Sequence, residues 1–305
     1  MSVTKNYKKM LEAADVDGIV QYFTQTFVNK YYDLYCQQLR FGGFDYRKNY
    51  RLKALLWKNG TAWIRKNPVG EPVVCDYTAS TYNYDNLPAT VQLLNPKNAP
   101  ASEIPTAATQ TVDVDGAIVW LRPNHKGLEE DVNYYIGKMA EAETCITINL
   151  AIQRMPWIIA TEPENAAKLK DLVKKILGNE ISIFTDIPKN EIDAITLPAP
   201  WIVDKLVAYE ERLENKIKTL LGIDNQGGYL NSQQQNLDTT NCNNDEINDS
   251  AEAQKTELED GFDRANKVLG LHLTVKQTSK PVEQIGKKPE GGPKDDLLDL
   301  QRTEQ

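Results

Sequence analysis

The residues of this chain whose chemistry could serve a reaction are two histidines, four cysteines and several paired carboxylates. His125 and His272 lack a second ligand at metal-site spacing, and nothing beside them resembles a base held by an orienting partner. Glu129-Glu130 and Glu210-Glu211 fall in helical patterns, where a solvated face is the ordinary interpretation. These residues therefore predict no catalytic group, no metal site and no cofactor.

Nucleotide and redox motifs are also missing from the sequence. It contains no GxxxxGK[ST] run and no GxGxxG between a strand and a helix, so we expect no nucleotide site. The scattered cysteines, Cys36, Cys75, Cys145 and Cys242, indicate free thiols, and the first and third have the pattern of small core residues.

Tyr77, Tyr82 and Tyr84 form an aromatic cluster that could contact nucleic acid, because aromatic rings stack on bases. A β core or a subunit contact is the favoured interpretation of these three rings. The net charge of −8 argues against tight, sequence-independent binding of nucleic acid, which needs a basic face. An acidic surface is still compatible with nucleic acid that slides past it.

Length and composition are those of a globular protein. The 305 residues are 41% hydrophobic and 26% charged, which allows one large domain or two small ones. No apolar run approaches the roughly 20 residues needed to span a bilayer, and residues 1–10 lack the apolar stretch of a signal peptide. We therefore expect no membrane contact and a protein made and kept in a reducing cytoplasm.

Helical and β-prone segments alternate in blocks along the chain. A helix is expected over 16–39, where Ile19, Phe23 and Phe27 recur at three- and four-residue spacing, and a shorter one over 50–57. Four short β-prone pieces then predict a small β module with long loops, namely 61–64, 73–77, 90–94 and 117–121.

Two long helices are expected to flank a compact insert. The first covers 126–155 and has an apolar face formed by Leu128, Val132, Tyr135, Met139, Ala142 and Ile146. The insert is predicted as a strand over 157–160, a helix over 162–177 and a strand over 181–185. The second long helix covers 199–222, with proline in its first turn.

This second helix has two different faces. Its apolar face, predicted to contact neighbouring subunits, carries Ile202, Leu206, Tyr209, Leu213 and Ile217. Its opposite face is small, polar or acidic and carries Asp204, Ala208, Glu211 and Asn215, with Lys205 and Arg212 beside them.

Residues 225–244 differ in kind from their surroundings, because half of them are Asn or Gln. The segment has too few apolar residues to fold alone, and a disordered surface loop remains one of its two interpretations. A third helix is expected over 245–269, a terminal strand over 271–276, and a flexible tail from residue 277.

The order of these parts resembles the portal, or upper-collar, proteins of small short-tailed bacteriophages. Residues 199–206 (APWIVDKL) and 221–225 (LGIDN) are similar to the start and end of that family's channel-lining helix. Residues 269–276 resemble its closing strand, and 58–63 together with 73–76 resemble its β module. The resemblance runs in order over residues 40–280.

The resemblance implies an α+β portal fold, with long stem and channel helices, an α/β clip and a small β-rich wing. The expected parts are an N-terminal helical part of the wing (1–60), the β-rich wing module (61–125), the stem helix (126–155), the clip (156–198), the channel helix (199–222), the channel loop (223–244), a C-terminal helix and strand (245–276) and the tail (277–305).

The resemblance also implies a function. About twelve copies would form a ring through heterologous interfaces at the capsid vertex, double-stranded DNA would pass through it, and a packaging ATPase, the major capsid and scaffold proteins and a lower collar or tail protein would bind it. The expected location is the virion, after assembly in the host cytoplasm. Channel-facing residues would be Asp204, Lys205, Ala208, Glu211, Arg212 and Asn215; channel-loop residues would be Asn225, Gln226, Gly227, Gly228, Asn231, Gln233, Gln234, Gln235 and Asn244.

Two features of the family's best-known member are missing. Its basic ring before the channel helix corresponds here to Thr196-Leu197, and residues 225–244 contain no lysine. The loop would therefore act on DNA by steric friction and hydrogen bonding. A neck adaptor or collar ring that binds only protein is the alternative function, and an enzyme with an unfamiliar site is a third.

Overall fold

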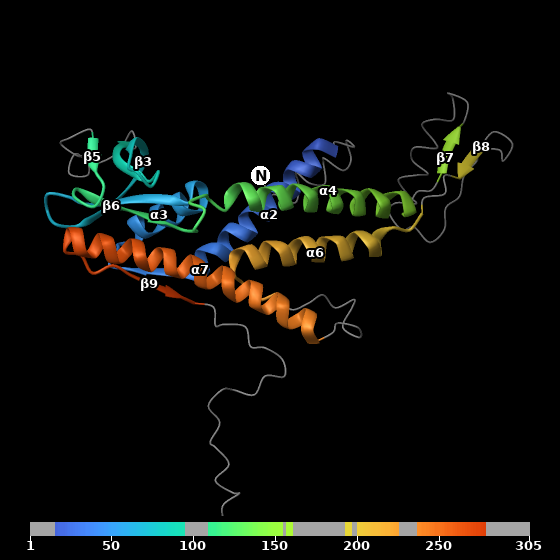
Figure 1. The fold of residues 1–305 in the computed structure, drawn as a ribbon. Coiled ribbons are helices and arrows are strands. Elements are labelled where there is room, and N and C mark those ends of the chain that lie inside the picture. The colour runs from blue at the N-terminus through green and yellow to red at the C-terminus, as the bar shows by residue number, and fades with distance from the viewer. Residues whose placement is uncertain are drawn as a thin grey trace, which may run out of the picture. The chain divides into compact units, whose positions relative to one another are not determined.

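The computed structural model describes residues 16–94, 109–154, 157–160, 193–196, 200–225 and 237–278. The chain divides into two compact units, the first comprising Met1–Tyr32 and Asn133–Glu214 and the second comprising Asp33–Val132 and Asn215–Gln305. Three long helices contribute residues to both units, namely α2 (Val16–Gln38), α4 (Glu129–Arg154) and α6 (Val203–Leu221) (Figure 1).

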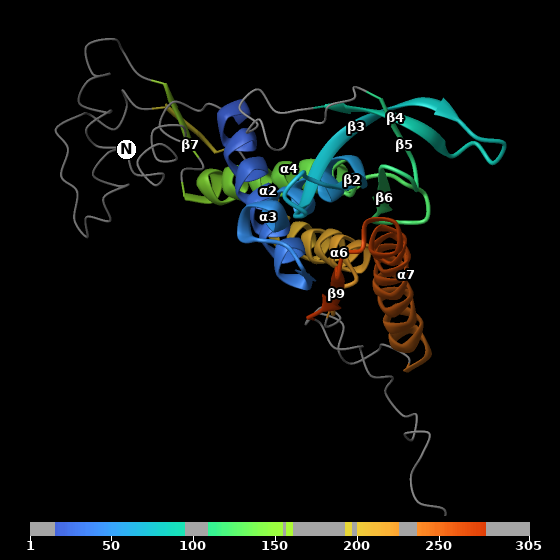
Figure 2. The same cartoon turned by 90° about the vertical axis from the view of Figure 1, so that its left-hand side faces the viewer.

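An antiparallel sheet of five strands lies at the centre of the second unit. Its order is β5-β4-β3-β2-β6, and β3 and β4 form a long ribbon (Figure 2). The strands are β2 (Thr61–Lys66), β3 (Pro72–Tyr82), β4 (Pro88–Leu94), β5 (Thr109–Thr111) and β6 (Gly116–Trp120). The structure confirms the four predicted β pieces. The edge strand β5 was not predicted, because its three residues are too short to show an alternating pattern.

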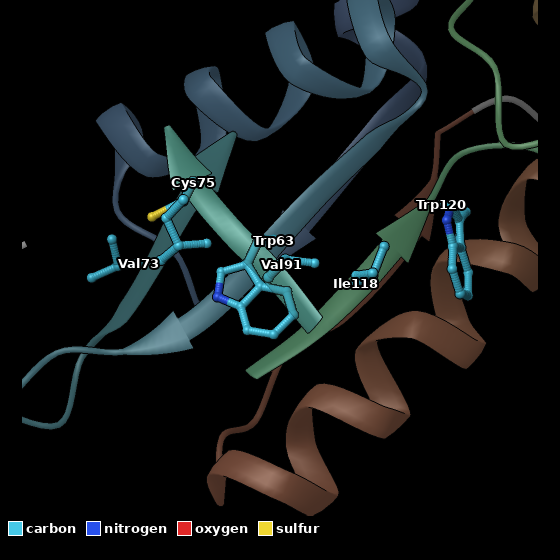
Figure 3. Packing of buried hydrophobic residues seen from close by; sticks show 7 residues of the cluster. Trp63, Val73, Cys75, Val91, Ile118 and Trp120 are labelled. Atoms are coloured by element: carbon cyan, nitrogen blue, oxygen red, sulfur yellow. The ribbon is translucent and has the colours of Figure 1, made fainter. Parts of the chain in front are cut away.

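Buried side chains from four strands form the core of this sheet (Figure 3). They are Trp63, Val73, Cys75, Val91, Leu93, Ile118 and Trp120. Tyr77 packs against them, with its ring centroid 6.5 Å from that of Trp63. Tyr82 and Tyr84 lie at the far end of the ribbon and are 59% and 102% exposed. Only Tyr77 of the three therefore fills a β core.

Helix α3 (Tyr46–Asn59) begins four residues before the predicted position because it has an N-cap. The side chain of Asp45 accepts a hydrogen bond from the backbone N–H of Lys48 at 2.9 Å, which satisfies a free donor of the first turn. The helix ends at Gly60, whose φ of 74° is left-handed. A Cβ at Gly60 would lie 2.2 Å from the carbonyl carbon of Lys126, so only glycine fits this close approach.

Helix α7 (Leu237–Leu269) packs against β6 through a glycine and an arginine. A Cβ on Gly261 would lie 3.0 Å from the Cα of Val119. The Arg264 guanidinium donates to the Ile118 carbonyl at 2.9 Å and lies 4.5 Å from the Trp120 ring centroid. These contacts attach a helix that is distant in sequence to one side of the sheet.

Two strands that are far apart in the sequence pair with one another in the second unit. Strand β1 (Leu39–Gly42) is antiparallel to β9 (Thr274–Gln277), with Leu39 opposite Gln277 and Gly42 opposite Thr274. β9 begins three residues after the predicted strand, and β1 was not predicted. His272 is exposed between the buried Leu271 and Leu273, which confirms its outward orientation.

Helices α2, α4 and α6 supply the core of the first unit, which includes Ile19, Tyr31, Met139, Ile146 and Leu213. Five of the six residues predicted for the apolar face are buried, namely Leu128 just before α4 and four residues within it, and Tyr135 is partly exposed. Cys145 was predicted to lie in the core but is exposed.

The insert contributes a two-stranded antiparallel sheet of β7 (Trp157–Ala160) and β8 (Asp193–Thr196). β7 confirms the first predicted strand of the insert, and β8 lies where no strand was predicted. The helix predicted over 162–177 and the strand predicted over 181–185 lie outside the described residues.

Candidate functional site on helix α6

The candidate site is the polar face of α6. Asp204, Lys205 and Arg212 are exposed, and Ala208 and Glu211 are partly exposed. Three- and four-residue spacing places these side chains along one side of the helix. The polar face predicted from the sequence is therefore not used for packing within the described part of the chain.

Trp201 extends this face and was missed by the sequence reasoning. Its side chain is 54% exposed, although tryptophan is usually buried. Its indole Nε1–H donates to Asp204 Oδ2 at 3.0 Å, which holds the ring beside the first turn of α6. Its position directly after Pro200 and three residues before Asp204 was the available signal.

The charges on this face nearly balance. Asp204 and Glu211 supply two negative groups, and Lys205 and Arg212 supply two positive ones. A polyanion binds tightly where several cations neutralise its phosphates. Alternating charges allow brief phosphate contacts without a continuous basic track, so this face is suited to transient contact with nucleic acid.

The opposite face of α6, predicted as a subunit interface, is partly covered within the single chain. Leu213 is 4% exposed and Ile217 is 0% exposed, so both already lie in the interior of the single chain. Ile202 and Leu206 are partly buried, and Tyr209 is 40% exposed. An apolar stripe shows that a helix face is buried, but not whether its own chain or another copy buries it.

Asn225, predicted as a channel-loop residue, follows α6 and folds back onto its last turns. Its side-chain amide donates to the Asn215 carbonyl at 3.1 Å and to Thr219 Oγ1 at 2.9 Å, and the residue is 3% exposed. Gly222, with a φ of 65°, allows the turn that brings Asn225 back onto the helix. Asn215 is partly exposed, and its carbonyl serves this cap.

The predicted loop is also shorter than expected at its far end. Helix α7 begins at Leu237, eight residues before the predicted start, and Asn244 is 5% exposed within it. Further along, Gln254 and Ser250 donate to the Leu220 carbonyl at 2.9 Å and 3.3 Å, which fixes α7 against the end of α6. Helix propagation from such an anchor costs little per residue, so the polar residues 237–244 continue the helix.

The remaining predicted loop residues lie outside the described residues, and they are Gln226, Gly227, Gly228, Asn231, Gln233, Gln234 and Gln235.

His125, which was considered for catalysis, packs against an aromatic ring of the sheet. His125 has a φ of 58° and stacks on Trp120, with ring centroids 4.4 Å apart. Within the described ranges, no group of three or more His, Cys, Asp or Glu side chains could hold a metal ion. The helices described here also include none that combines the length and apolar character needed to cross a bilayer.

These features define a mixed α+β protein whose candidate site is a long helix surface and not a catalytic constellation. The family model described as Phage Connector (GP10) matches residues 113–282, which is more than half of the chain. The chain therefore belongs to the phage connector family. This finding confirms the resemblance to portal, or head–tail connector, proteins and assigns the chain to a family of structural proteins of the bacteriophage particle.

Three solved structures are similar to this chain over most of its length. A chain in the portal and tail of native bacteriophage P68 is 12% identical, with a TM-score of 0.48, covering 91% of this chain and 93% of that one. An HK97-family phage portal protein from Corynebacterium diphtheriae is 10% identical, with a TM-score of 0.45 and coverages of 83% and 93%.

A chain in the virion of a native gene transfer agent particle is 10% identical, with a TM-score of 0.42 and coverages of 82% and 79%. The assignment to the connector family rests on the matched segment 113–282 and not on these structural likenesses.

Proposed function

We propose that the chain is a portal subunit that forms a closed ring of about twelve copies, through which double-stranded DNA enters and leaves the capsid. The observation that carries this proposal is the connector-family match over 113–282, which includes the whole of α6. The exposed polar face of α6 supports it, because a channel wall needs a helix face that its own chain leaves uncovered.

In this ring, Asp204, Ala208, Glu211 and Asn215 face the passage, with Lys205 and Arg212 at its edge. Each of the four charged side chains is repeated by every copy and so forms a ring of like charge. Debye screening over about 8 Å at physiological salt limits how far each ring acts on the DNA. Alternating rings of opposite sign then give weak contacts that release as the DNA moves.

The partners follow from the same proposal. The insert, residues 156–198, contacts a packaging ATPase during assembly and a lower collar or tail protein afterwards, while the wing contacts the major capsid and scaffold proteins. Assembly takes place in the host cytoplasm, and the finished ring remains in the virion. Residues 226–236 contact the passing DNA and slow its backward movement.

Contacts between copies must use residues other than Leu213 and Ile217, which are internal. Tyr209 remains available, and Tyr134 on α4 is 60% exposed. Lys138 holds the Tyr134 ring in place, with its Nζ donating to the phenol oxygen at 2.7 Å and lying 4.3 Å from the ring centroid. Exposed, oriented tyrosines are typical anchors of protein interfaces.

Mass photometry and negative-stain imaging of the purified full-length chain test the proposal. We expect a single large species, ring-shaped, with an open centre and about twelve subunits. Only monomers and dimers at micromolar concentration, over several salt concentrations, would contradict ring formation. A ring whose centre is too narrow for a DNA duplex would instead favour a neck adaptor that binds only protein.

A further inference from the structure

The outward face of the two-stranded sheet is basic. Arg40 on β1 is the direct cross-strand partner of Lys276 on β9, and both side chains are exposed. Like charges that stand directly opposite each other on one face of a sheet repel, so the pair is unfavourable unless an anionic group lies against it. Among the described residues, neither of the two has an ion-pair partner. We call these two residues the basic surface.

The segment that follows β1 in the chain is also basic. Residues 40–58 contain six basic residues and one acidic residue, in a chain whose net charge is −8. Within the described part of the chain, only one of these six cations forms an ion pair, namely Lys48, which contacts Asp45 and Glu71 at 3.2 Å and 3.1 Å. Positive charge without a partner is therefore concentrated in β1 and α3, although the chain is acidic as a whole.

Helix α7 has the opposite character. Residues 245–263 contain eight acidic residues and one basic residue. Seven of the eight exposed positions in this stretch are acidic, and we call them the acidic face: Asp245, Glu246, Asp249, Glu252, Glu259, Asp260 and Asp263. Lys255 neutralises part of it, since its Nζ lies 3.6 Å and 3.9 Å from two of these carboxylates. Asp249 and Asp260 have no ion-pair partner among the described residues.

The acidic face has the shape of a protein contact and not of a metal site. At 1.5 Å per residue, its carboxylates are spread over about 27 Å of helix and do not converge on one point. No group of three or more His, Cys, Asp or Glu side chains in the described ranges could hold a metal ion. A partner that neutralises this face must therefore present several cations on an extended surface.

The two charged surfaces point away from each other within one chain. The strand pair and α7 pack through apolar side chains, with the ring centroids of Phe41 on β1 and Phe262 on α7 5.6 Å apart. Arg40 precedes Phe41 on the strand and so points to the other side of the sheet. The acidic face lies opposite the buried Leu258 and Phe262 on α7. A single copy therefore cannot bring these surfaces together, whereas two copies can.

We propose that the acidic face of α7 binds the basic surface, Arg40 and Lys276, of a neighbouring copy. The inference rests on the proposed ring and adds the pair of surfaces that joins each subunit to the next. A closed ring needs heterologous contacts, in which every copy presents two different and complementary patches. One such contact relieves the repulsion between Arg40 and Lys276 and supplies cations to α7. Complementary charges also fix the register of an interface and exclude wrong pairings.

Charge reversal in the full-length chain tests this pairing. The two double variants are Arg40→Glu/Lys276→Glu and Asp249→Lys/Asp260→Lys. All four positions are exposed, so both variants should keep the Tm of the wild type by circular dichroism. At about 0.15 M salt, where charges are screened beyond about 8 Å, mass photometry should show that each needs roughly tenfold more protein for half of it to form rings.

The variant with all four reversals should form rings at the wild-type concentration. Its net charge equals that of the wild type, and its two reversed surfaces attract each other again. Asp85→Lys/Glu130→Lys is the matched control, because it reverses two exposed carboxylates outside α7. This control should assemble as the wild type does.

Three results would overturn the inference while leaving the ring in place. They are rings formed by either double variant at the wild-type concentration, a fourfold variant that does not regain assembly, and a control that assembles as poorly as the double variants. Loss of binding to a short DNA duplex in Arg40→Glu/Lys276→Glu, with assembly unchanged, would assign the basic surface to nucleic acid instead. A wild-type chain that forms no rings would contradict the proposed function together with this inference.

Discussion

At the scale of single residues, the extent to which its own chain covers a side chain of α6 decides the role of that residue, even between neighbours on one face. Leu213 is buried inside the chain, whereas Tyr209, one turn away, is 40% exposed. A charge introduced at a buried position has no partner and costs several kcal/mol of folding free energy. At an exposed position it costs little in the monomer and acts only on a contact with another copy.

Leu213→Asp and Tyr209→Asp should therefore have different effects. We expect Leu213→Asp to lower the free energy of unfolding by about 3–5 kcal/mol or to prevent folding, whereas Tyr209→Asp changes it by less than about 0.5 kcal/mol and weakens ring formation. Urea unfolding and mass photometry measure the two quantities. A well-folded Leu213→Asp chain would show that the buried side of α6 is assigned incorrectly.

At the scale of elements, two glycines differ in whether the structure leaves room for a side chain. Gly222 follows α6 with a φ of 65°, and a Cβ there would lie 2.7 Å from the Cβ of Ala251 on α7. Gly137 lies within α4, and a Cβ there would meet nothing within 4 Å. Gly222 is thus required by the fold of the chain, whereas a mid-helix glycine such as Gly137 costs stability relative to alanine.

Alanine at these two positions should change stability in opposite directions. We expect Gly222→Ala to lower the free energy of unfolding by roughly 1–3 kcal/mol, and Gly137→Ala to raise it by about 0.5–1 kcal/mol. Chemical denaturation of each full-length variant measures both changes. If Gly137→Ala is destabilising, some undescribed part of the chain or a second copy lies against α4 at that residue.

At the scale of the whole molecule, we propose that the segment that retains DNA is different from the contacts that hold the fold of each ring subunit together. α6 and α7 are joined by Gln254 and Ser250, which donate to the Leu220 carbonyl, and by the packing of Gly222 against Ala251. These contacts lie outside residues 226–236. The connection between the two helices therefore does not depend on the segment proposed to reach the DNA.

Replacing residues 226–236 with a short glycine–serine linker should leave rings intact. Residues 237–243 are kept, because they belong to α7. Packaging should begin normally, but DNA should slip back late in filling, when the friction supplied by the loop is most needed. The amount of full-length genome held after the motor is removed measures this effect. Retention equal to wild type would assign the segment to an ordinary surface loop.

Much of the architecture was predictable from local sequence. The bounds of α2, the existence of α6 and its end within one residue, the strand β7 and four strands of the sheet follow from hydrophobic spacing and turn residues, which act over a few positions. The predicted start of α6 was four residues too early, because 200–202 are not helical. The order of the parts also led to the connector family, which the match over 113–282 confirms. The polar face of α6 was predicted from helical spacing, because side chains three and four residues apart share a face.

Contacts between distant segments were decided only by the tertiary structure. The pairing of β1 with β9, the burial of Leu213 and Ile217 within the chain, and the ion pair between Lys30 and Glu214 each depend on segments far apart in sequence. Asn225 and Asn244 are buried, although the polar sequence around them predicted a loop. Periodicity shows which side of a helix avoids water, but only the fold decides which atoms cover that side.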